Sequence, residues 1–393
     1  IKVESTGSNS LTMENHFEHL EGSVAVHKIL RSILEIEAGR PYGSIKIVAQ
    51  PDFNYLYECL SVLDFTSSKT KIVNIICFDK NNRAQNRMYN LNMFQNLAPT
   101  LFSCPNFEPY YIYDNVDTLF NNMSFLPYVV ITHDYVLHIS YETDYAVLSR
   151  HTKQLDLANK YFDRRLSVAH PVYNIVDAEP EKYLSSTPLL INLEEENHYN
   201  LSYQPTMTPF ITEPMLRDHL HLESLSPKMV ELIKDYLLKI RESRVTVHVS
   251  FTMEGLEYFF ETGRFSEILD FLYTPLAPKH RIELMHNLLD DVERGRYKPR
   301  VIKTAIFPIP LPVCLTSCSL QSVIIFYTNQ RFGLGVFQLS EVSMLNAFND
   351  FLVYVQDSEL VYSEDESLKL MRDLLDKYER KFGIRGKSEK SQS

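Results

Sequence analysis

The sequence predicts an α/β protein made of two similar lobes, each with a mixed β-sheet flanked by helices. Two observations lead to this prediction. Strand-like and helix-like segments alternate in both halves of the 393-residue chain, which is the order of βαβ units. In addition, a helix, a short strand, a hairpin and a final helix occur in the same order twice, which indicates an internal duplication.

The first copy begins with a helix at 23–40, where apolar residues recur at steps of three and four. The run KIVNIICF at 71–78 is almost continuously apolar, which is typical of a strand that is covered on both faces. The other predicted elements of this copy are strands at 45–49 and 109–116, helices at 51–65 and 150–163, and a hairpin at 127–140.

The second copy begins with a helix at 280–296, which ends in Glu-x-Gly-Arg as the first helix does. A strand at 300–303, a hairpin at 322–339 and a helix at 364–380 follow. Ahead of this copy, 245–251 alternates as a strand and leads into a helix. The alternative to a duplication is that ordinary α/β patterns recur by chance, and the sequence leaves both open.

Changes in composition along the chain predict its domain boundaries. Six prolines interrupt the segment 167–226 and a seventh, Pro227, follows it directly, so we expect a connection without long elements there. The predicted division is a linker or tail at 1–19, a first lobe at 20–166, the connection at 167–226, a second lobe at 227–382 and a disordered tail at 383–393.

The charge argues against direct binding to nucleic acid. Lys and Arg number 39 against 50 Asp and Glu, which gives a net charge of −11, and the basic residues form no block. A duplex-binding surface needs a concentrated basic face. The chain has no apolar run of membrane-spanning length and no signal peptide, and it begins with Ile1. We therefore expect a cytoplasmic fragment of a longer protein that does not contact a membrane.

Cysteine and histidine usage predicts no cofactor and no metal. The five cysteines are an odd number and lie mostly in apolar runs, which favours reduced, buried thiols. Cys314 and Cys318 lack the spacing of zinc or redox sites. His219 and His221 stand two apart, but no thiol or carboxylate follows at a ligand spacing.

The usual catalytic motifs are absent. The chain contains no Gly-x-Gly-x-x-Gly, no phosphate-loop Gly-Lys-Ser/Thr, no His-Glu-x-x-His and no Gly-x-Ser-x-Gly. We therefore expect no enzymatic activity.

Three stretches give the chain a family resemblance. GSIKIVAQPDF, VTVHVSFTMEGLEYFFETGRFSEI and SELVYSEDESLKLMRDLLDKY resemble the effector half of Cro-type helix-turn-helix regulators of Gram-positive bacteria, over residues 20–382. The resemblance implies an effector region that senses a small molecule or peptide. It also implies that the region reaches DNA only through an N-terminal domain outside this chain, and that it forms a homodimer.

The repeated order of elements is also similar to the duplicated phospholipase D fold, whose hallmark is His-x-Lys-x4-Asp on a hairpin of each repeat. On the first hairpin, the best registers place Leu126-x-Tyr128-x4-His133 or Pro127-x-Val129-x4-Asp134 there. The second hairpin offers Ser322-x-Ile324-x4-Asn329. Both copies lack the histidine nucleophile and the lysine, so this resemblance implies a fold without phosphodiesterase chemistry.

Polar residues after two predicted strands are the candidate ligand-binding site. Gln50 and Asp52 follow the strand at 45–49, and Ser250 and Thr252 follow VTVHV at 245–249. Because α/β sheets bind ligands beyond the carboxyl ends of their strands, these four residues are expected to line a cleft shared by the lobes. The alternative is that Asp52 and Thr252 only cap the helices that follow.

Two other functions stay open at the sequence level. One is a protein-interaction scaffold without a small ligand. The other is an enzyme of an unrecognised family, with His133 and Asp134, or His248 and Glu254, as acid–base candidates.

Overall fold

The computed structural model consists of two compact units, which are described separately: unit 1 is residues 1–172 and unit 2 is residues 173–393. The structure describes residues 17–63, 65, 69–79, 84–104, 106–116, 125–175, 197–221, 226–242, 245–266, 273–307, 313–319, 322–329, 333–339 and 341–384. Most of the two predicted tails, 1–19 and 383–393, lies outside these ranges.

Unit 1 alternates strands and helices up to β4 and then continues with antiparallel strands. Its elements are β1 (Phe17–Glu21), α1 (Ser23–Ala38), β2 (Ser44–Val48), α2 (Asn54–Val62), β3 (Lys71–Asp79), α3 (Ala84–Ser103), β4 (Phe107–Asp114), β5 (Tyr128–Ile131), β6 (Val136–Ile139), β7 (Tyr145–Ser149), α4 (Thr152–Leu166) and β8 (His170–Pro171). The sheet has the order β1-β7-β6-β5-β2-β3-β4-β8.

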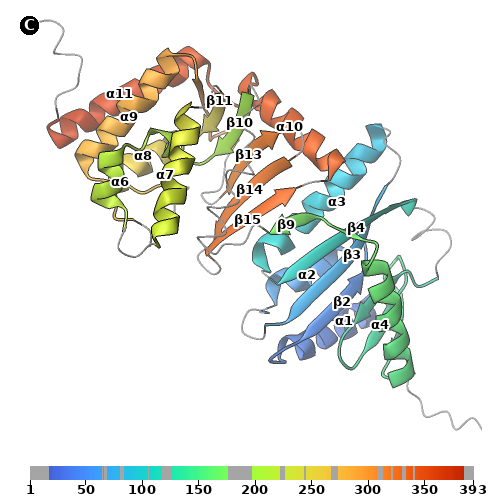
Figure 1. The fold of residues 1–393 in the computed structure, drawn as a ribbon. Coiled ribbons are helices and arrows are strands. Elements are labelled where there is room, and N and C mark those ends of the chain that lie inside the picture. Colours follow the sequence, from blue (N-terminus) through green and yellow to red (C-terminus); the bar gives the residue numbers. More distant parts are fainter. Residues whose placement is uncertain are drawn as a thin grey trace, which may run out of the picture. The chain divides into compact units, whose positions relative to one another are not determined.

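Helices cover both faces of this sheet (Figure 1). Lys46 of β2 bonds Asp163 of α4 over 2.7 Å and lies 5.4 Å from the centre of the Phe162 ring, so α4 covers the face to which Lys46 points. Ile45 and Ile47 point to the opposite face, because side chains alternate along a strand, and both are fully buried. The sheet is therefore the middle layer of unit 1.

Unit 2 has the same kind of architecture. Its elements are β9 (Tyr173–Ile175), β10 (Asn197–Ser202), the 3₁₀ helix η2 (Thr208–Phe210), α6 (Glu213–His219), α7 (Pro227–Glu242), β11 (Thr246–Phe251), α8 (Met253–Thr262), α9 (Pro278–Glu293), β12 (Tyr297–Val301), β13 (Val313–Ser319), β14 (Ser322–Asn329), β15 (Gly333–Leu339), α10 (Val342–Gln356) and α11 (Glu364–Phe382). The sheet has the order β12-β11-β10-β13-β14-β15-β9.

Two apolar clusters belong to this second sheet. The larger one joins β11 and β12 to α8, α9 and α11, with Phe259, Phe260 and Tyr378 among its fully buried rings. The smaller one packs Leu201 of β10 against Leu352 and Val355 of α10. Both sheets are mixed and carry helices, so the predicted fold class of two α/β lobes is confirmed.

The two sheets share one topology. In unit 1, β2, β3 and β4 are parallel neighbours, and β2 also starts the antiparallel series β5, β6, β7, β1. In unit 2, β10 takes the place of β2: β11 and β12 follow in parallel on one side, and β13, β14, β15 and β9 follow on the other. The residues after the two central strands also match, as Gln50-Pro51 and Gln204-Pro205. This agreement supports an internal duplication.

The register of the repeat differs from the one predicted from sequence. The hairpin at 127–140 corresponds to β13 and β14, whereas the predicted partner at 322–339 forms β14 and β15. Similarly, α4 corresponds to α10 in strand and helix order, not to the helix at 364–380. The sequence comparison relied on helix ends, and these look alike wherever a helix stops at glycine.

Part of the predicted connection at 167–226 lies inside the second sheet. Its residues 197–202 form β10, the central strand. The sequence NHYNLS hides this strand because its buried polar side chains interrupt the apolar pattern. Asn200 is satisfied there by Thr206, at 2.6 Å, and by Thr316. A buried amide with these partners costs little, so a polar strand can occupy the middle of a sheet.

A buried glutamine follows each central strand: Gln50 after β2 and Gln204 after β10. Removal of the Gln50 amide tests how much it stabilises unit 1. Gln50 donates to the Cys77 carbonyl over 2.9 Å and accepts from the Cys77 N–H over 2.7 Å. The substitution Gln50→Ala leaves both Cys77 groups buried and unpaired, so we expect a loss of about 2–4 kcal/mol in the free energy of unfolding, measured by urea denaturation.

The matched control is Gln154→Ala on α4, because Gln154 is less buried and accepts one bond, from Ser149 over 3.2 Å. This control should lose less than about 1 kcal/mol. Equal losses for the two variants would contradict the role given to the Gln50 amide.

Candidate functional site

Gln50, the first predicted site residue, is completely buried. Besides the two bonds to Cys77, its amide donates to the Tyr89 hydroxyl over 2.8 Å. The NH₂ group and the carbonyl oxygen of the Gln50 side chain are therefore hydrogen-bonded within the protein. Gln50 fixes the chain just after β2 through these bonds, and its side chain is too buried to contact a ligand.

Asp52 does not cap the helix that follows it. The N-cap of α2 is Phe53, and no side chain bonds the first turn. The Asp52 carboxylate instead accepts hydrogen bonds from Tyr128, over 3.2 Å, and from Tyr141, over 3.3 Å. Burial, followed by the nearby Asp52 charge, raises the pKa of Tyr128 well above its usual range, so its hydroxyl stays protonated and can donate.

Ser250 and Thr252 have structural roles in unit 2. Ser250 is fully buried and accepts a hydrogen bond from Gln356 over 2.8 Å. Thr252 is the N-cap of α8: its hydroxyl accepts from Gly255 N–H over 2.9 Å and donates to the Tyr203 carbonyl over 2.8 Å. A Cβ on Gly255 would lie 1.8 Å from that carbonyl, so only glycine fits this close approach.

The predicted cleft shared by the lobes stays a prediction. Gln50 and Asp52 belong to unit 1, whereas Ser250 and Thr252 belong to unit 2. Within unit 1 the structure brings Gln50 and Asp52 to the end of the same strand, and only Asp52 reaches an open pocket.

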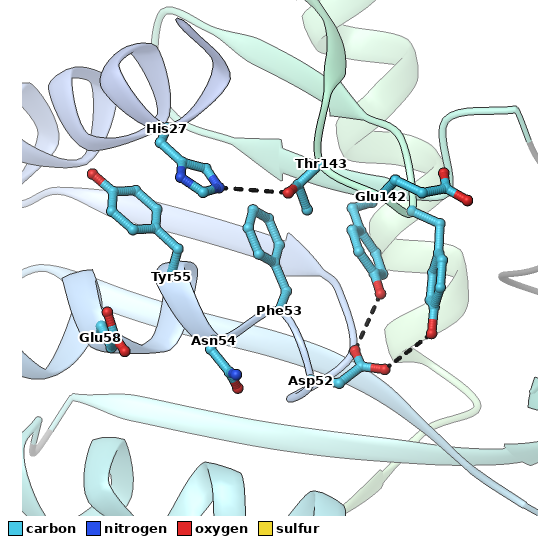
Figure 2. A pocket seen from close by; sticks show the side chains of 10 residues that line it. His27, Asp52, Phe53, Asn54, Tyr55, Glu58, Glu142 and Thr143 are labelled. Atoms are coloured by element: carbon cyan, nitrogen blue, oxygen red, sulfur yellow. Dashed lines mark hydrogen bonds between the residues drawn. The ribbon is translucent and has the colours of Figure 1, made fainter. Parts of the chain in front are cut away.

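We name this opening the Asp52 pocket; it has a volume of about 540 Å³. Figure 2 shows Asp52 with its two tyrosine bonds, and His27 directed at Thr143 from the other side. The lining comes from α1, from the loop after β2 and from α2, from β5, and from the turn between β6 and β7. The residues are His27, Asp52, Phe53, Asn54, Tyr55, Glu58, Tyr128, Tyr141, Glu142 and Thr143.

Aromatic rings form the walls of the Asp52 pocket as two stacked pairs. Phe53 stacks on Tyr128 with ring centres 5.5 Å apart, and His27 stacks on Tyr55 with ring centres 4.0 Å apart. Burial lowers the pKa of His27, so its imidazole is neutral at pH 7. Phe53 and Tyr128 are 5 % and 1 % exposed, so the half-buried His27 and Tyr55 are the rings more open to a ligand, and Asp52 offers it a charged acceptor.

Thr143 adds local strain at the rim of this pocket. Its φ is 61°, in the left-handed region that β-branched residues rarely adopt. The turn is held by the bond from Thr143 N–H to the Ser140 carbonyl, over 3.0 Å. Strained residues cluster at binding sites because the surrounding structure must enforce them, so the turn is a second local sign of function here.

A second constellation lies at the turn between β5 and β6. Glu37, at the end of α1, is 1 % exposed and accepts a bond from Ser44 N–H over 2.7 Å. The same carboxylate pairs with His133 Nδ1 and lies 3.3 Å from Arg40 Nε. Arg40 also pairs with Asp134. The carboxylate thus ties the end of α1 to both β2 and the hairpin.

The other acid–base pair predicted from sequence is not assembled. His248 bonds Asn197 over 3.0 Å and stacks on Tyr199 with ring centres 4.6 Å apart. Glu254 instead accepts a bond from Thr304 over 2.9 Å. Burial, followed by the charges of Lys298 and Arg300, lowers the pKa of His248. His133 is therefore the better placed of the two histidines.

The described ranges contain no group of three or more His, Cys, Asp or Glu side chains that could hold a metal ion. His219 bonds His280 over 2.8 Å, so it pairs with another imidazole across unit 2. Among the described residues, Cys59, Cys77, Cys104 and Cys314 are not in disulfide bonds. No helix in the described part of the chain is long and apolar enough to cross a bilayer.

The sequence did not reveal the aromatic partners of Asp52. Tyr128 and Tyr141 lie 76 and 89 residues further along the chain, and neither belongs to a recognised motif. One signal was present: Tyr128 occupies the position of the phospholipase lysine in the register Leu126-x-Tyr128-x4-His133. The structure directs the Tyr128 hydroxyl at the Asp52 carboxylate.

No family model and no curated protein matches the chain. Among solved structures, it is similar to phosphatidylserine synthase of Haemophilus influenzae Rd KW20, with 10 % identity, 94 % of each chain covered and a TM-score of 0.27. It is also similar to polyphosphate kinase of Porphyromonas gingivalis, with 11 % identity, a TM-score of 0.25, and coverage of 92 % of this chain and 55 % of that one. Both have phospholipase D-like folds.

A third similar structure is TrmBL2, described as an archaeal chromatin protein with a novel mode of DNA binding. The identity is 10 %, the TM-score is 0.26, and the match covers 43 % of this chain and 57 % of that one. TM-scores this low assign none of the three activities to the present chain. None of these three structures is described as a Cro-type regulator.

One expectation is corrected by these comparisons. Two of the three structures are enzymes, which contradicts the prediction that the chain has no enzymatic activity, and that prediction is withdrawn. It rested on missing motifs. A missing motif excludes the chemistry of one family. It does not test catalysis by residues that are distant in sequence and adjacent in the fold, such as Glu37 and His133.

The buried carboxylate of Glu37 provides a test of the second constellation. The substitution Glu37→Ala removes the partner of Ser44, His133 and Arg40 at once. The Ser44 N–H loses its acceptor, whereas His133 and Arg40 are 45 % and 36 % exposed and are partly screened by solvent. We therefore expect a loss of about 1–3 kcal/mol in unfolding free energy by urea denaturation.

Glu35 of the same helix is the matched control. It forms an exposed pair with Arg31 at 2.7 Å, and exposed pairs contribute less than about 1 kcal/mol. If Glu35→Ala and Glu37→Ala destabilise the chain equally, the constellation does not hold the hairpin to α1.

Proposed function

We propose that this chain is the ligand-sensing effector region of a cytoplasmic bacterial transcription regulator, and that the Asp52 pocket is its ligand site. The observation that carries the proposal is Asp52 itself. Its side chain leaves the helix start uncapped and is held at the pocket by two tyrosine hydroxyls. A carboxylate that only closed a helix end would bond the backbone of α2 instead.

The position and size of the pocket support the same proposal. It lies at the carboxyl end of β2, where open α/β sheets place their ligands. Its volume of about 540 Å³ falls within the range of roughly 300–1,000 Å³ that is typical of small-molecule sites. A metabolite or a short peptide segment fits such a space.

In this proposal, the chain acts on DNA through a DNA-binding domain outside it and forms a homodimer. The net charge of −11, with no basic block, supports a separate DNA-binding segment, because a duplex needs a concentrated basic face. Ligand binding then shifts an equilibrium between two arrangements of the protein, and the shift is limited by the difference in ligand affinity between them.

The ligand site is tested by a thermal-shift screen of metabolites and short peptides. We expect at least one compound to raise the melting temperature, and its affinity to fall about tenfold in Asp52→Asn, because a hydrogen bond to a charged group contributes about 1.5–3 kcal/mol. The control Asp156→Asn changes an exposed carboxylate of α4 that pairs with Lys160. The same affinity in both variants would place the site elsewhere.

The regulator assignment is tested with the complete gene product. The reading frame upstream of Ile1 should encode a helix-turn-helix domain of roughly 60–80 residues. Ligand should then change the affinity of the full-length protein for its own promoter in a gel-shift assay. A frame without such a domain, or a promoter affinity that the ligand does not alter, would contradict this part of the proposal.

A second candidate function is acid–base catalysis at His133. A buried carboxylate that bonds Nδ1 of a histidine fixes its tautomer and orientation, which is the arrangement of hydrolase triads. Glu37 bonds His133 in this way, and the imidazole is 45 % exposed. Among the described residues, we find no partner for Nε2, so this atom can accept a proton from a substrate.

Catalysis at His133 is tested by a hydrolase panel of phosphodiester, ester and glycoside substrates. If the dyad is catalytic, His133→Gln should lower the rate at least about 100-fold, the usual contribution of a general base. His170→Gln, at the edge of the sheet, should leave the rate unchanged. Absence of turnover on the whole panel, or equal rates in both variants, would remove this candidate.

A further inference from the structure

The Asp52 pocket has an unusual balance of charge among its lining residues. Asp52, Glu58 and Glu142 contribute three carboxyl groups, and no Lys or Arg lines the pocket. Asp52 is partly buried at the base, whereas Glu58 and Glu142 are exposed. Carboxyl groups are ordinarily ionised at neutral pH, and burial lowers the pKa of the one basic group, His27, so it adds no positive charge. The pocket is therefore negative.

The aromatic walls favour the same sign of ligand charge. The face of an aromatic ring carries partial negative charge and attracts cations. Phe53 and Tyr128 form one stacked pair, and Tyr141 lies 5.9 Å from Tyr128 between ring centres. A cation that bonds Asp52 lies beside the half-buried Tyr141, whereas Tyr128 is only 1 % exposed.

Asp52 also keeps free acceptor capacity. Tyr128 donates to Oδ1 and Tyr141 donates to Oδ2, which leaves further lone pairs because a carboxylate accepts about four hydrogen bonds. The donors that match these lone pairs best are those of an ammonium or guanidinium group, since charge-assisted bonds are the strongest. A phosphate or carboxylate ligand finds no cationic partner among the lining residues.

On the basis of the proposed function, we propose that the ligand of the Asp52 pocket is a small organic cation, an amine or guanidine, whose nitrogen bonds Asp52 beside Tyr141. The acidic rim formed by Glu58 and Glu142 attracts the cation and accepts a second basic group, where the ligand has one. A neutral polyol and an organic anion are the alternatives that the test distinguishes.

Three probes with the same four-carbon chain separate these classes: putrescine with two ammonium groups, butane-1,4-diol with two hydroxyls, and succinate with two carboxylates. Binding to the whole chain is followed by calorimetry and by NMR at low ionic strength. We expect putrescine to bind at least about tenfold more tightly than either other probe. Its affinity should fall when salt is added, because salt screens the exposed rim charges.

The variants Asp52→Asn and Glu142→Gln should each weaken putrescine binding, Asp52→Asn by about tenfold or more. Glu21→Gln, an exposed carboxylate at the end of β1 that does not line the pocket, should not. Equal binding of putrescine and butane-1,4-diol, tighter binding of succinate, or equal effects of all three variants would overturn the inference.

Failure of this inference is distinguishable from failure of the proposed function. A neutral or anionic hit from the metabolite screen that depends on Tyr141→Phe and Asp52→Asn would overturn the cation class and leave the pocket as the ligand site. A screen in which no compound depends on either variant would overturn both.

Discussion

Much of unit 1 depends on one buried amide at the end of its central strand. Gln50 pairs with both backbone groups of Cys77 on the neighbouring strand and with the Tyr89 hydroxyl. These bonds hold the chain at the point where it leaves the sheet, and Pro51 then stiffens the turn. Gln204 makes equivalent bonds in unit 2, where its amide donates to the Arg264 carbonyl and accepts from the Ser266 N–H. Neither amide is available to a ligand, yet each fixes the loop that follows.

The consequence in unit 1 is a carboxylate with a fixed position. Asp52 stands two residues after the amide and meets the tyrosines of β5 and of the turn after β6. The corresponding residue of unit 2 is Thr206, which bonds Asn200 within its own sheet. The duplicated framework therefore carries two different loops, and only unit 1 presents a charged acceptor there. Divergence of function between repeats requires only such loop changes.

The sequence predicted the fold better than it predicted the site. Apolar residues at steps of three and four identified the helix at 23–40, which is α1 (Ser23–Ala38), because burial of one helix face dictates that spacing. The continuous apolar run at 71–78 identified the buried strand β3 (Lys71–Asp79). These patterns missed β10, whose polar side chains are satisfied by tertiary hydrogen bonds rather than exposed. The sequence analysis identified Asp52 but not Tyr128 and Tyr141, because contacts across 76 and 89 residues leave no local sequence pattern. Thr252 proved to be the helix cap that its residue type allowed.

The central claim is that ligand binds at the end of β2 in unit 1. Hydrogen–deuterium exchange of the whole chain, with and without the tightest compound found, tests it most directly, because bound ligand slows local opening of the backbone it contacts. The account predicts slower exchange at 52–58 and 140–145, and unchanged exchange at 197–206, the corresponding region of unit 2. Protection confined to unit 2, or absent from 52–58 and 140–145, would contradict it.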